Sequence, residues 1–535
     1  MKAWLTNTDE NPPIRAEPTD GLTLRDVEKA EPASTSSPTS SERDFEGRVG
    51  PAKRYFKSIE QTLFRYNIEA RGVERVLPEH RHDMHRMGFV QVCLVWISIN
   101  LEAIMVTLGM LGPAVYYLPF TDACLLGVFG ALLGSLPVAY IATLGPKSGL
   151  RTMILTRYVT GWWPSKLIVV LALIVFLGYL LIDAVIGGQI LSAVSPNDSL
   201  SVIVGIVIVC VLSWVVSTCG YAFFHTYERY AWLPQLIILC LLAGVAGPKF
   251  DLTANPSEGA SLGEIAGNRL SFFSLCLASQ ITYAQAAADF FVYYPVDTSR
   301  TKMFLSTTIG LTVSSAFTLI LGIGLASGTA SVPEWSAAYE TSQGALIVEA
   351  FRPLGGFGSF CSVLLALGLV GNMVPPLYAS GIDFQALGRP FARVPRILWT
   401  TLAIVIPLVA AIAGREHLAQ IFTNFLALMG YWVSIWIAIV LEEHFLFRRS
   451  LARPDGWDWA AWDDRSRLPL GLAALFAFLV GWAGAILCMA QVYYVGPLAG
   501  LISEYGGDMG NYVGFAWAAV VFPPARWLEL RRFGR

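Results

Sequence analysis

The run Ser279-Gln280-Ile281-Thr282-Tyr283-Ala284-Gln285, followed by Ala286-Ala287-Ala288-Asp289, decides how this chain is expected to fold. It lies inside the apolar segment 272–295, which is long enough to cross a lipid bilayer. Within hydrocarbon each polar side chain needs a protein partner or water, so a plain helix facing lipid is disfavoured. The run therefore predicts a broken helix whose polar residues face a protein interior.

A second interruption lies five apolar segments earlier in the chain. The first segment contains Trp96-Ile97-Ser98-Ile99-Asn100-Leu101-Glu102, which places a carboxyl deep in the expected span, and Gly109 and Gly112-Pro113 follow it. Two broken spans at corresponding positions are the pattern of a five-plus-five inverted repeat with a binding site near its midplane. We predict this repeat, with two further helices at the C-terminal end.

Composition places most of the chain in lipid. Of the 535 residues, 55% are hydrophobic and 14% are charged, whereas soluble proteins average about 25% charged residues. Twelve apolar stretches of about 18 to 27 residues are each long enough to cross about 30 Å of hydrocarbon. Their centres are Ile99, Gly130, Ile182, Cys210, Ile238, Ile281, Val313, Ala366, Ile404, Trp432, Gly481 and Trp517. The sequence therefore predicts an all-α polytopic membrane protein with twelve transmembrane helices.

The positions of the cations predict the orientation. Of the 37 Lys and Arg residues, 14 precede residue 87, 19 lie on one side of the predicted spans and four lie on the other. Because cytoplasmic loops are enriched in Lys and Arg, both termini are predicted to be cytoplasmic. We expect a disordered cytoplasmic tail (1–50), an amphipathic cytoplasmic segment (51–86), a twelve-helix transporter domain (87–523) and a cytoplasmic C-terminal tail (524–535).

Several functional classes find no support in the sequence. The net charge is −2 and no basic run is interleaved with aromatic residues, so a nucleic-acid partner is not expected. No HExxH or Walker-type motif is present, and the eight cysteines show no metal-ligand spacing. We therefore expect neither an enzyme nor a metal site. A channel would not explain acidic residues inside several spans, which favours a permease.

Polar residues within the spans mark the expected transport path. Glu102 lies deep in the first span and Asp183 is central in the third, although an ionised carboxylate at mid-membrane costs roughly 2.5 to 3.5 kcal/mol. In the eighth span, Asn372 precedes Pro375-Pro376, whose missing backbone donors leave carbonyl groups free. These residues are typical of a cavity wall.

Six short motifs follow one another along the chain. They are Tyr66-Asn-Ile-Glu-Ala-Arg-Gly-Val-Glu-Arg-Val76, Gly145-Pro-Lys-Ser-Gly-Leu-Arg-Thr-Met153, Gly187-Gly188-Gln189, Asn424-Phe-Leu-Ala-Leu-Met-Gly-Tyr-Trp432, Leu441-Glu-Glu-His-Phe-Leu-Phe447 and Arg526-Trp-Leu-Glu-Leu-Arg531. Together they resemble the fungal purine-cytosine permeases of nucleobase-cation symporter family 1. The resemblance extends from about residue 60 to the C-terminus.

The resemblance implies twelve spans with the leucine-transporter-type inverted repeat. It also implies import of a nucleobase, such as cytosine or a purine, with protons across the plasma membrane. A branch of the family is associated with vitamin B6, so a pyridoxine-type or other small heterocycle is the alternative substrate. No cofactor is implied beyond the proton gradient, sodium coupling stays an open alternative, and the oligomeric state is not indicated.

The candidate substrate-binding residues also come from the resemblance. They are Ser98, Asn100, Tyr179, Asp183, Tyr283 and Asn372. The family more often has Trp at the positions of Tyr179 and Tyr283 and Asn or Gln at that of Asp183. A second Asn is common where this chain has Pro376. These departures all fall at the expected ligand, so the resemblance specifies the fold more firmly than the substrate.

The expected mechanism combines ring stacking with a titratable carboxyl. Tyr179 and Tyr283 would stack on a planar ring while the other four residues bind its edge. A protonated Asp183 offers a donor and an acceptor, as an amide does, and burial favours the uncharged form; ionised, it favours a cationic or donor-rich ligand. Asp183 is our first proton-coupling candidate and Glu102 the second. The alternatives are a structural partner for Asp183, such as Gln189, and a water-filled vestibule beside Glu102.

Overall fold

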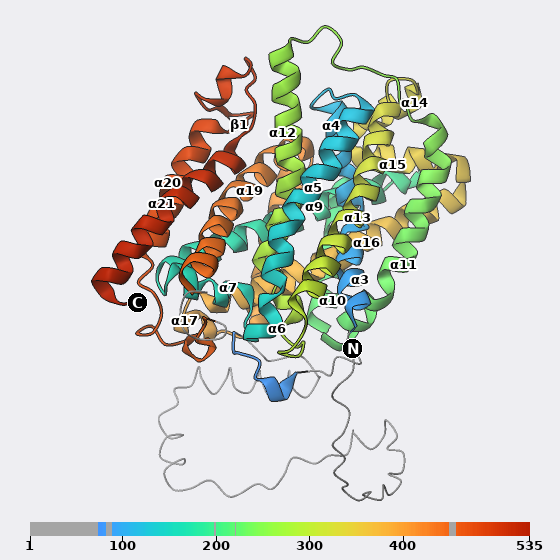
Figure 1. Cartoon of the computed structure of the whole chain (residues 1–535). Coiled ribbons are helices and arrows are strands. Elements are labelled where there is room, and N and C mark those ends of the chain that lie inside the picture. Colours follow the sequence, from blue (N-terminus) through green and yellow to red (C-terminus); the bar gives the residue numbers. More distant parts are fainter. Residues whose placement is uncertain (1–72, 82–87, 197–198, 220, 449–455) are drawn as a thin grey trace, which may run out of the picture. The chain divides into compact units, whose positions relative to one another are not determined.

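The computed structural model describes residues 73–81, 88–196, 199–219, 221–448 and 456–535. This part of the chain is almost entirely helical, with one short antiparallel hairpin (Figure 1). The expected tail 1–50 lies outside the described residues, as does the expected amphipathic segment apart from 73–81.

Each of the twelve predicted centres lies in a helix. The helices are α3 (Phe89–Asn100), α5 (Phe120–Ala142), α9 (Pro164–Val194), α10 (Val202–Cys219), α11 (Tyr221–Ala246), α12 (Leu262–Ile281), α13 (Arg300–Gly328), α16 (Gly356–Ala386), α18 (Arg396–Gly414), α19 (Leu418–Glu442), α20 (Leu472–Cys488) and α21 (Gly510–Phe533). By length and hydropathy, seven helices of the described chain are able to cross a membrane, and one bent pair makes an eighth. The chain is therefore polytopic.

Shorter elements connect these helices. They are η2 (Pro78–His80), α6 (Leu144–Ser148), α7 (Thr152–Leu155), α8 (Arg157–Thr160), η5 (Gly247–Lys249), α14 (Pro333–Thr341), α15 (Gln343–Phe351), η8 (Arg352–Leu354), α17 (Arg389–Ala392), η9 (Glu443–Arg448), η10 (Trp459–Ala461), β1 (Ala490–Gln491), β2 (Tyr494–Val495) and η11 (Ala499–Leu501). Helix α21 continues to Phe533, so most of the expected C-terminal tail 524–535 is helical.

Both predicted interruptions are present. Helix α3 ends at Asn100, α4 (Ala103–Ala114) begins three residues later, and the two axes differ by 59°. Glu102 between them has an extended backbone. Helix α12 ends at Ile281 and passes into the 3₁₀ turns η6 (Thr282–Ala286) and η7 (Asp289–Phe291). The regular α-helix therefore stops within the polar run 279–285.

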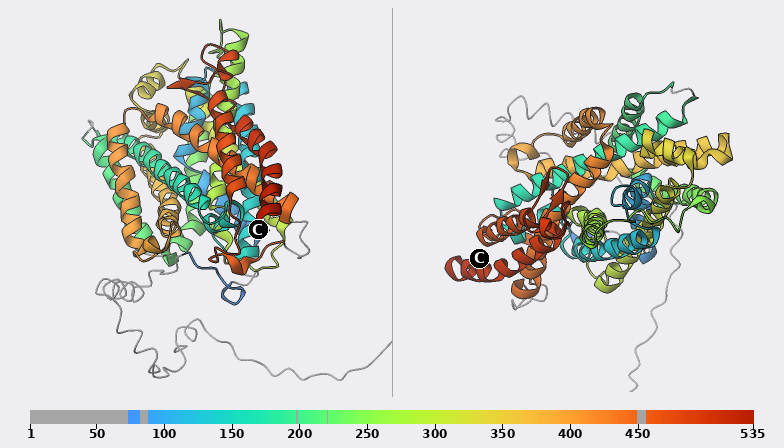
Figure 2. Two further views of the ribbon diagram at one scale, coloured as in Figure 1. Left: turned by 90° about the vertical axis from the view of Figure 1, so that its left-hand side faces the viewer. Right: turned by 90° about the horizontal axis from the view of Figure 1, so that it is seen from above.

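Long-range packing divides most of the long helices into two groups (Figure 2). Helices α4, α5, α12 and α13 pack together, and helices α9, α10, α16 and α18 pack together. Gly322 of α13 lies where an added methyl group would overlap the Val106 carbonyl of α4. A small residue is needed there because the two backbones approach closely. Helices α20 and α21 pack on each other and on α19, beside the first group.

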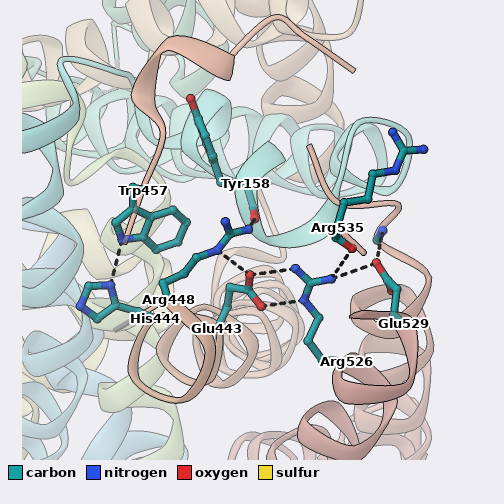
Figure 3. A network of polar contacts seen from close by, with 9 residues as sticks. Tyr158, Glu443, His444, Arg448, Trp457, Arg526, Glu529 and Arg535 are labelled. Atoms are coloured by element: carbon teal, nitrogen blue, oxygen red, sulfur yellow. Dashed lines mark hydrogen bonds and ion pairs between the residues drawn. The ribbon is translucent and has the colours of Figure 1, made fainter. Parts of the chain in front are cut away.

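A buried ion-pair network holds the last two helices to α19 (Figure 3). Glu443 is fully buried and accepts from Arg448 Nε at 2.7 Å and from Arg526 Nε at 2.9 Å. Glu529 accepts from the backbone N–H groups of Gly471 and Ala473, which begin α20. Two motifs of the sequence analysis, 441–447 and 526–531, thus contact each other as a structural clamp.

The described N-terminal residues are bound to the connection after α5. Val76 N donates to Gly149 O at 2.8 Å, and Arg75 Nε donates to Ser148 O at 2.7 Å. Gly149 has a φ of 67°, in the left-handed region that favours glycine. This contact joins two more of the sequence motifs and fixes the backbone that leads to Arg151.

Candidate substrate-binding site

A cavity of about 150 Å³ lies between α3, α9, the η6–η7 turns and α16. An apolar protein cavity of about this volume is able to hold a benzene-sized molecule. The polar residues that line it are Gln91, Arg151, Tyr179, Asp183, Thr282, Tyr283, Gln285, Asp289, Tyr294, Asn372 and Tyr378. Four of the six predicted substrate-binding residues, Tyr179, Asp183, Tyr283 and Asn372, are among them.

The two tyrosines present nearly parallel rings to the cavity. The planes of Tyr179 and Tyr283 differ by 17° and the ring centroids are 6.3 Å apart. Tyr179 is fixed in place because its hydroxyl lies 2.6 Å from Thr282 Oγ1. Rings that line a cavity offer faces on which a planar ligand ring is able to stack.

Asp183 and Asn372 meet across the cavity wall. Asp183 is fully buried in α9, and its Oδ2 accepts from Asn372 Nδ2 of α16 at 3.0 Å. Its other oxygen, Oδ1, is buried without a hydrogen-bond partner in the described part of the chain. A buried carboxylate oxygen needs a donor, a bound ligand or a proton. The expected partner Gln189 instead has its Oε1 directed to Gly344 N.

Glu102 is the second carboxyl near this site. It is 5% exposed at the break between α3 and α4, and its Oε2 has no partner among the described residues. It does not line the cavity. Glu102 is therefore a buried carboxyl outside the cavity lining.

Ser98 and Asn100 also lie outside the cavity lining, unlike the other four predicted residues. Asn100 is fully buried, and its Oδ1 accepts from Gln280 Nε2 at 3.3 Å and from Ser315 Oγ at 3.1 Å. These bonds join the broken first span to α12 and α13. In this conformation Asn100, at the end of α3, thus connects the first break to Gln280 near the end of α12.

A family described as "Permease for cytosine/purines, uracil, thiamine, allantoin" has a model that matches residues 78–502. The chain belongs to this family. It is therefore a membrane permease and not an enzyme.

Individual relatives cover most of the permease. The chain is 33% identical to the vitamin B6 transporter TPN1 of Saccharomyces cerevisiae, with 88% of each chain covered. It is 35% identical to the purine-cytosine permease fcyB of Emericella nidulans (90% and 92% covered) and 34% identical to the purine-cytosine permease FCY21 of S. cerevisiae (88% of each). Relatives named for different substrates are thus about equally similar.

Solved structures show the fold of the permease. The inward-facing conformation of Mhp1 matches with a TM-score of 0.61 at 14% identity, covering 86% of this chain and 95% of that one. A Na⁺-coupled sialic acid symporter matches with a TM-score of 0.55 at 12% identity (90% and 98% covered). At these identities the likeness concerns the fold alone.

The sequence does not predict the charged residues of the cavity wall. Arg151 has its Nη1 3.8 Å from Asp289 Oδ2, and its Nη2 donates to Tyr378 OH at 3.2 Å. Asp289 also accepts from Thr152 N and Oγ1 at 2.7 and 2.9 Å. The motif 145–153, which carries Arg151 and Thr152, was the available signal. These contacts place an ion pair in the lining of the permease cavity.

The described residues include no group of three or more His, Cys, Asp or Glu side chains that could hold a metal ion.

Proposed function

We propose that this permease is a proton-coupled symporter that imports a nucleobase, such as cytosine or a purine, across the plasma membrane by alternating access. The observation that carries the proposal is Asp183, a buried carboxyl that lines a ring-sized cavity beside two parallel tyrosines and keeps one oxygen unpaired. The family and its purine-cytosine permeases support the substrate class.

The proposed topology has twelve spans, formed by a five-plus-five inverted repeat and the two added helices α20 and α21. The packing of the helices supports this repeat, because equivalent helices of the two halves lie together. One group contains α4, α5, α12 and α13, and the other contains α9, α10, α16 and α18. The bias of Lys and Arg supports cytoplasmic termini.

Proton coupling follows from the cost of burying charge. An ionised Asp183 in the cavity wall would be poorly compensated, since Asn372 donates to only one of its oxygens. Binding a proton removes that cost and lets the loaded carrier reorient. One charge moving through 100 mV releases about 2.3 kcal/mol, which supports roughly 50-fold accumulation of a neutral substrate. Glu102 is the second candidate for holding the proton.

Vitamin B6 is the second candidate substrate. The similarity to TPN1 is comparable to that with the purine-cytosine permeases, and Asp183 stands where the resemblance leads us to expect an amide. A carboxylate would suit the protonated ring nitrogen or the hydroxyl groups of a pyridoxine-type ligand.

The test is uptake of labelled substrate into cells that lack their own permeases. We expect accumulation against a gradient, abolished by a protonophore and unaffected when sodium is replaced by choline. Competition by cytosine, adenine, hypoxanthine, pyridoxine and allantoin identifies the substrate. Accumulation that survives the protonophore would refute proton coupling, and absence of uptake of every compound would refute the proposed function.

A further inference from the structure

Gln285 is a polar residue of the cavity that neither the resemblance nor the spacing of motifs assigns to the ligand. It lies in η6, two residues after Tyr283, and lines the same cavity. Its side chain is buried, with 2% of the residue exposed, and Oε1 has no hydrogen-bond partner among the described residues. A buried amide oxygen is normally hydrogen-bonded, so an unpaired one beside a cavity requires an explanation.

Other buried glutamines show what a structural role looks like in this fold. Gln280 donates to Asn100 Oδ1 at 3.3 Å, and Gln235 donates to the Leu364 carbonyl at 3.0 Å. Each leaves its own Oε1 unpaired, but neither lines the cavity. Their amides are explained by the helix contacts they make. Gln285 differs because its unpaired oxygen belongs to a residue of the cavity wall.

The cavity thus contains two buried acceptors without donors, Gln285 Oε1 and Asp183 Oδ1. They come from η6 and α9, the two elements that also supply the parallel rings of Tyr283 and Tyr179. Both residues line the cavity that the two tyrosine rings also line. Only N–H or O–H groups of a ligand held there would satisfy the two oxygens, whereas a carbonyl facing Asp183 would be repelled unless the carboxyl is protonated.

We propose that Gln285 is a further ligand-binding residue and that, together with Asp183, it selects a heteroaromatic ligand carrying exocyclic hydrogen-bond donors. This inference rests on the proposed function because it concerns the same cavity. The amide of Gln285 does not titrate, so its oxygen accepts a hydrogen bond from the ligand at any pH. The carboxylate of Asp183 also accepts one, but after binding a proton the carboxyl is able to donate instead.

The experiment measures binding to the purified full-length permease in detergent, by ligand-dependent thermal stabilisation. Three pairs of probes each differ by one donor: adenine and purine, cytosine and 2-pyrimidinone, pyridoxine and 4-deoxypyridoxine. In whichever pair binds, the donor-bearing member is expected to bind about tenfold more tightly. Gln285→Met should reduce that preference to about twofold while keeping the side-chain volume.

Gln235→Met is the matched control, since it removes a buried glutamine with an unpaired oxygen outside the cavity. It should leave the preference of the binding pair at about tenfold. An equal preference in wild type and Gln285→Met, or no preference in wild type, would overturn the inference.

Uptake separates this inference from the proposed function. Selective binding without accumulation in cells would refute the symporter while supporting the ligand preference. Accumulation of a heterocycle that binds equally well with and without the exocyclic donor would support the symporter and refute the ligand preference. If no probe binds, both fail.

Discussion

Asn372 Nδ2 donates a hydrogen bond of 3.0 Å to Asp183 Oδ2, and this bond joins α16 to α9 at the cavity. The two residues are 189 positions apart in the sequence. The bond leaves Asp183 with one oxygen held by Asn372 and one, Oδ1, buried without a hydrogen-bond partner among the described residues. Under the proposed function, the carboxyl of Asp183 would bind both the proton and the ligand.

Asp183→Asn should remove the pH dependence of transport. With a proton as co-substrate, as we propose, wild-type uptake should fall as external pH rises, by up to about tenfold per pH unit once the carboxyl is largely ionised. An amide does not titrate, so the variant should show a flat pH profile and exchange substrate without concentrating it. The measurement is initial uptake rate between pH 4 and 8.

Asp122→Asn is the control for this variant. Asp122 begins α5 and pairs with Arg269 away from the cavity, with an Nε to Oδ2 distance of 2.9 Å. This change should preserve the wild-type pH profile. An unchanged pH profile in Asp183→Asn with an altered ligand preference would assign Asp183 to recognition only.

Removing an aromatic ring from the cavity should weaken binding more than removing its hydroxyl. Tyr283→Ala is expected to raise the KM for uptake about tenfold, because stacking contributes about 0.5–1.5 kcal/mol beyond the lost apolar contact. Tyr283→Phe should change the KM by less than about threefold, since the ring that is parallel to Tyr179 remains. Equal effects of the two substitutions would contradict stacking.

Gly178 makes room for Phe425 beside the ligand site. A methyl group added to Gly178 would overlap the Phe425 ring, which packs edge-on against Tyr179 with centroids 6.5 Å apart. Gly178→Ala should therefore displace the ring and cost about 1–3 kcal/mol of stability, as overpacked cores do. Thermal unfolding and KM report the two effects.

The double variant Gly178→Ala/Phe425→Leu tests the cause. A smaller side chain at 425 should relieve the overlap and recover at least part of the lost stability. If Phe425→Leu lowers the stability of the Gly178→Ala variant further, overlap with the Phe425 ring is not the reason that Gly178→Ala destabilises the protein.

Arg526→Met should destabilise the permease strongly. It removes one of the two guanidinium partners of the fully buried Glu443, and breaking a buried ion pair typically costs about 3–5 kcal/mol. The double variant Glu443→Gln/Arg526→Met should be less damaging than the single one, because residue 443 is then uncharged and only Glu529, which also accepts from Arg526 Nη1 at 3.2 Å, loses that partner. Thermal unfolding in detergent measures both.

Arg352→Met provides the comparison for the buried clamp. Arg352 pairs with Glu349 at 3.1 Å, but its side chain is 70% exposed, and surface pairs contribute little. Its unfolding temperature should stay near that of wild type. A fall as large as that of Arg526→Met would contradict the role given to burial.

The interruptions of the helices could be predicted from the sequence because they follow from local chemistry. The polar run 279–285 cannot stay in lipid as a plain helix, and the chain does leave the α-helix at Thr282. The bond between Asp183 and Asn372 could be expected only through the resemblance, since periodicity does not specify which helices meet.

The rest of the site depends on packing that the sequence does not reveal. The sequence places Arg151 only in the motif 145–153, and the fold brings it to Asp289 and the cavity. Asn100, which is predicted to bind the ligand, lies outside the cavity lining and accepts from Ser315, and its role stays a prediction. Gln285 is one polar residue among several in the sequence, and only the structure shows that it lines the cavity with an unpaired oxygen.

Proton-coupled transport through Asp183 is best measured in liposomes that contain the purified permease, with an imposed proton gradient and no sodium. Labelled substrate should concentrate inside wild-type vesicles when the outside is acidic, and Asp183→Asn vesicles should only equilibrate it. Dissipating the gradient should release the accumulated label. Accumulation driven by a sodium gradient alone, or undiminished accumulation in Asp183→Asn, would contradict the account.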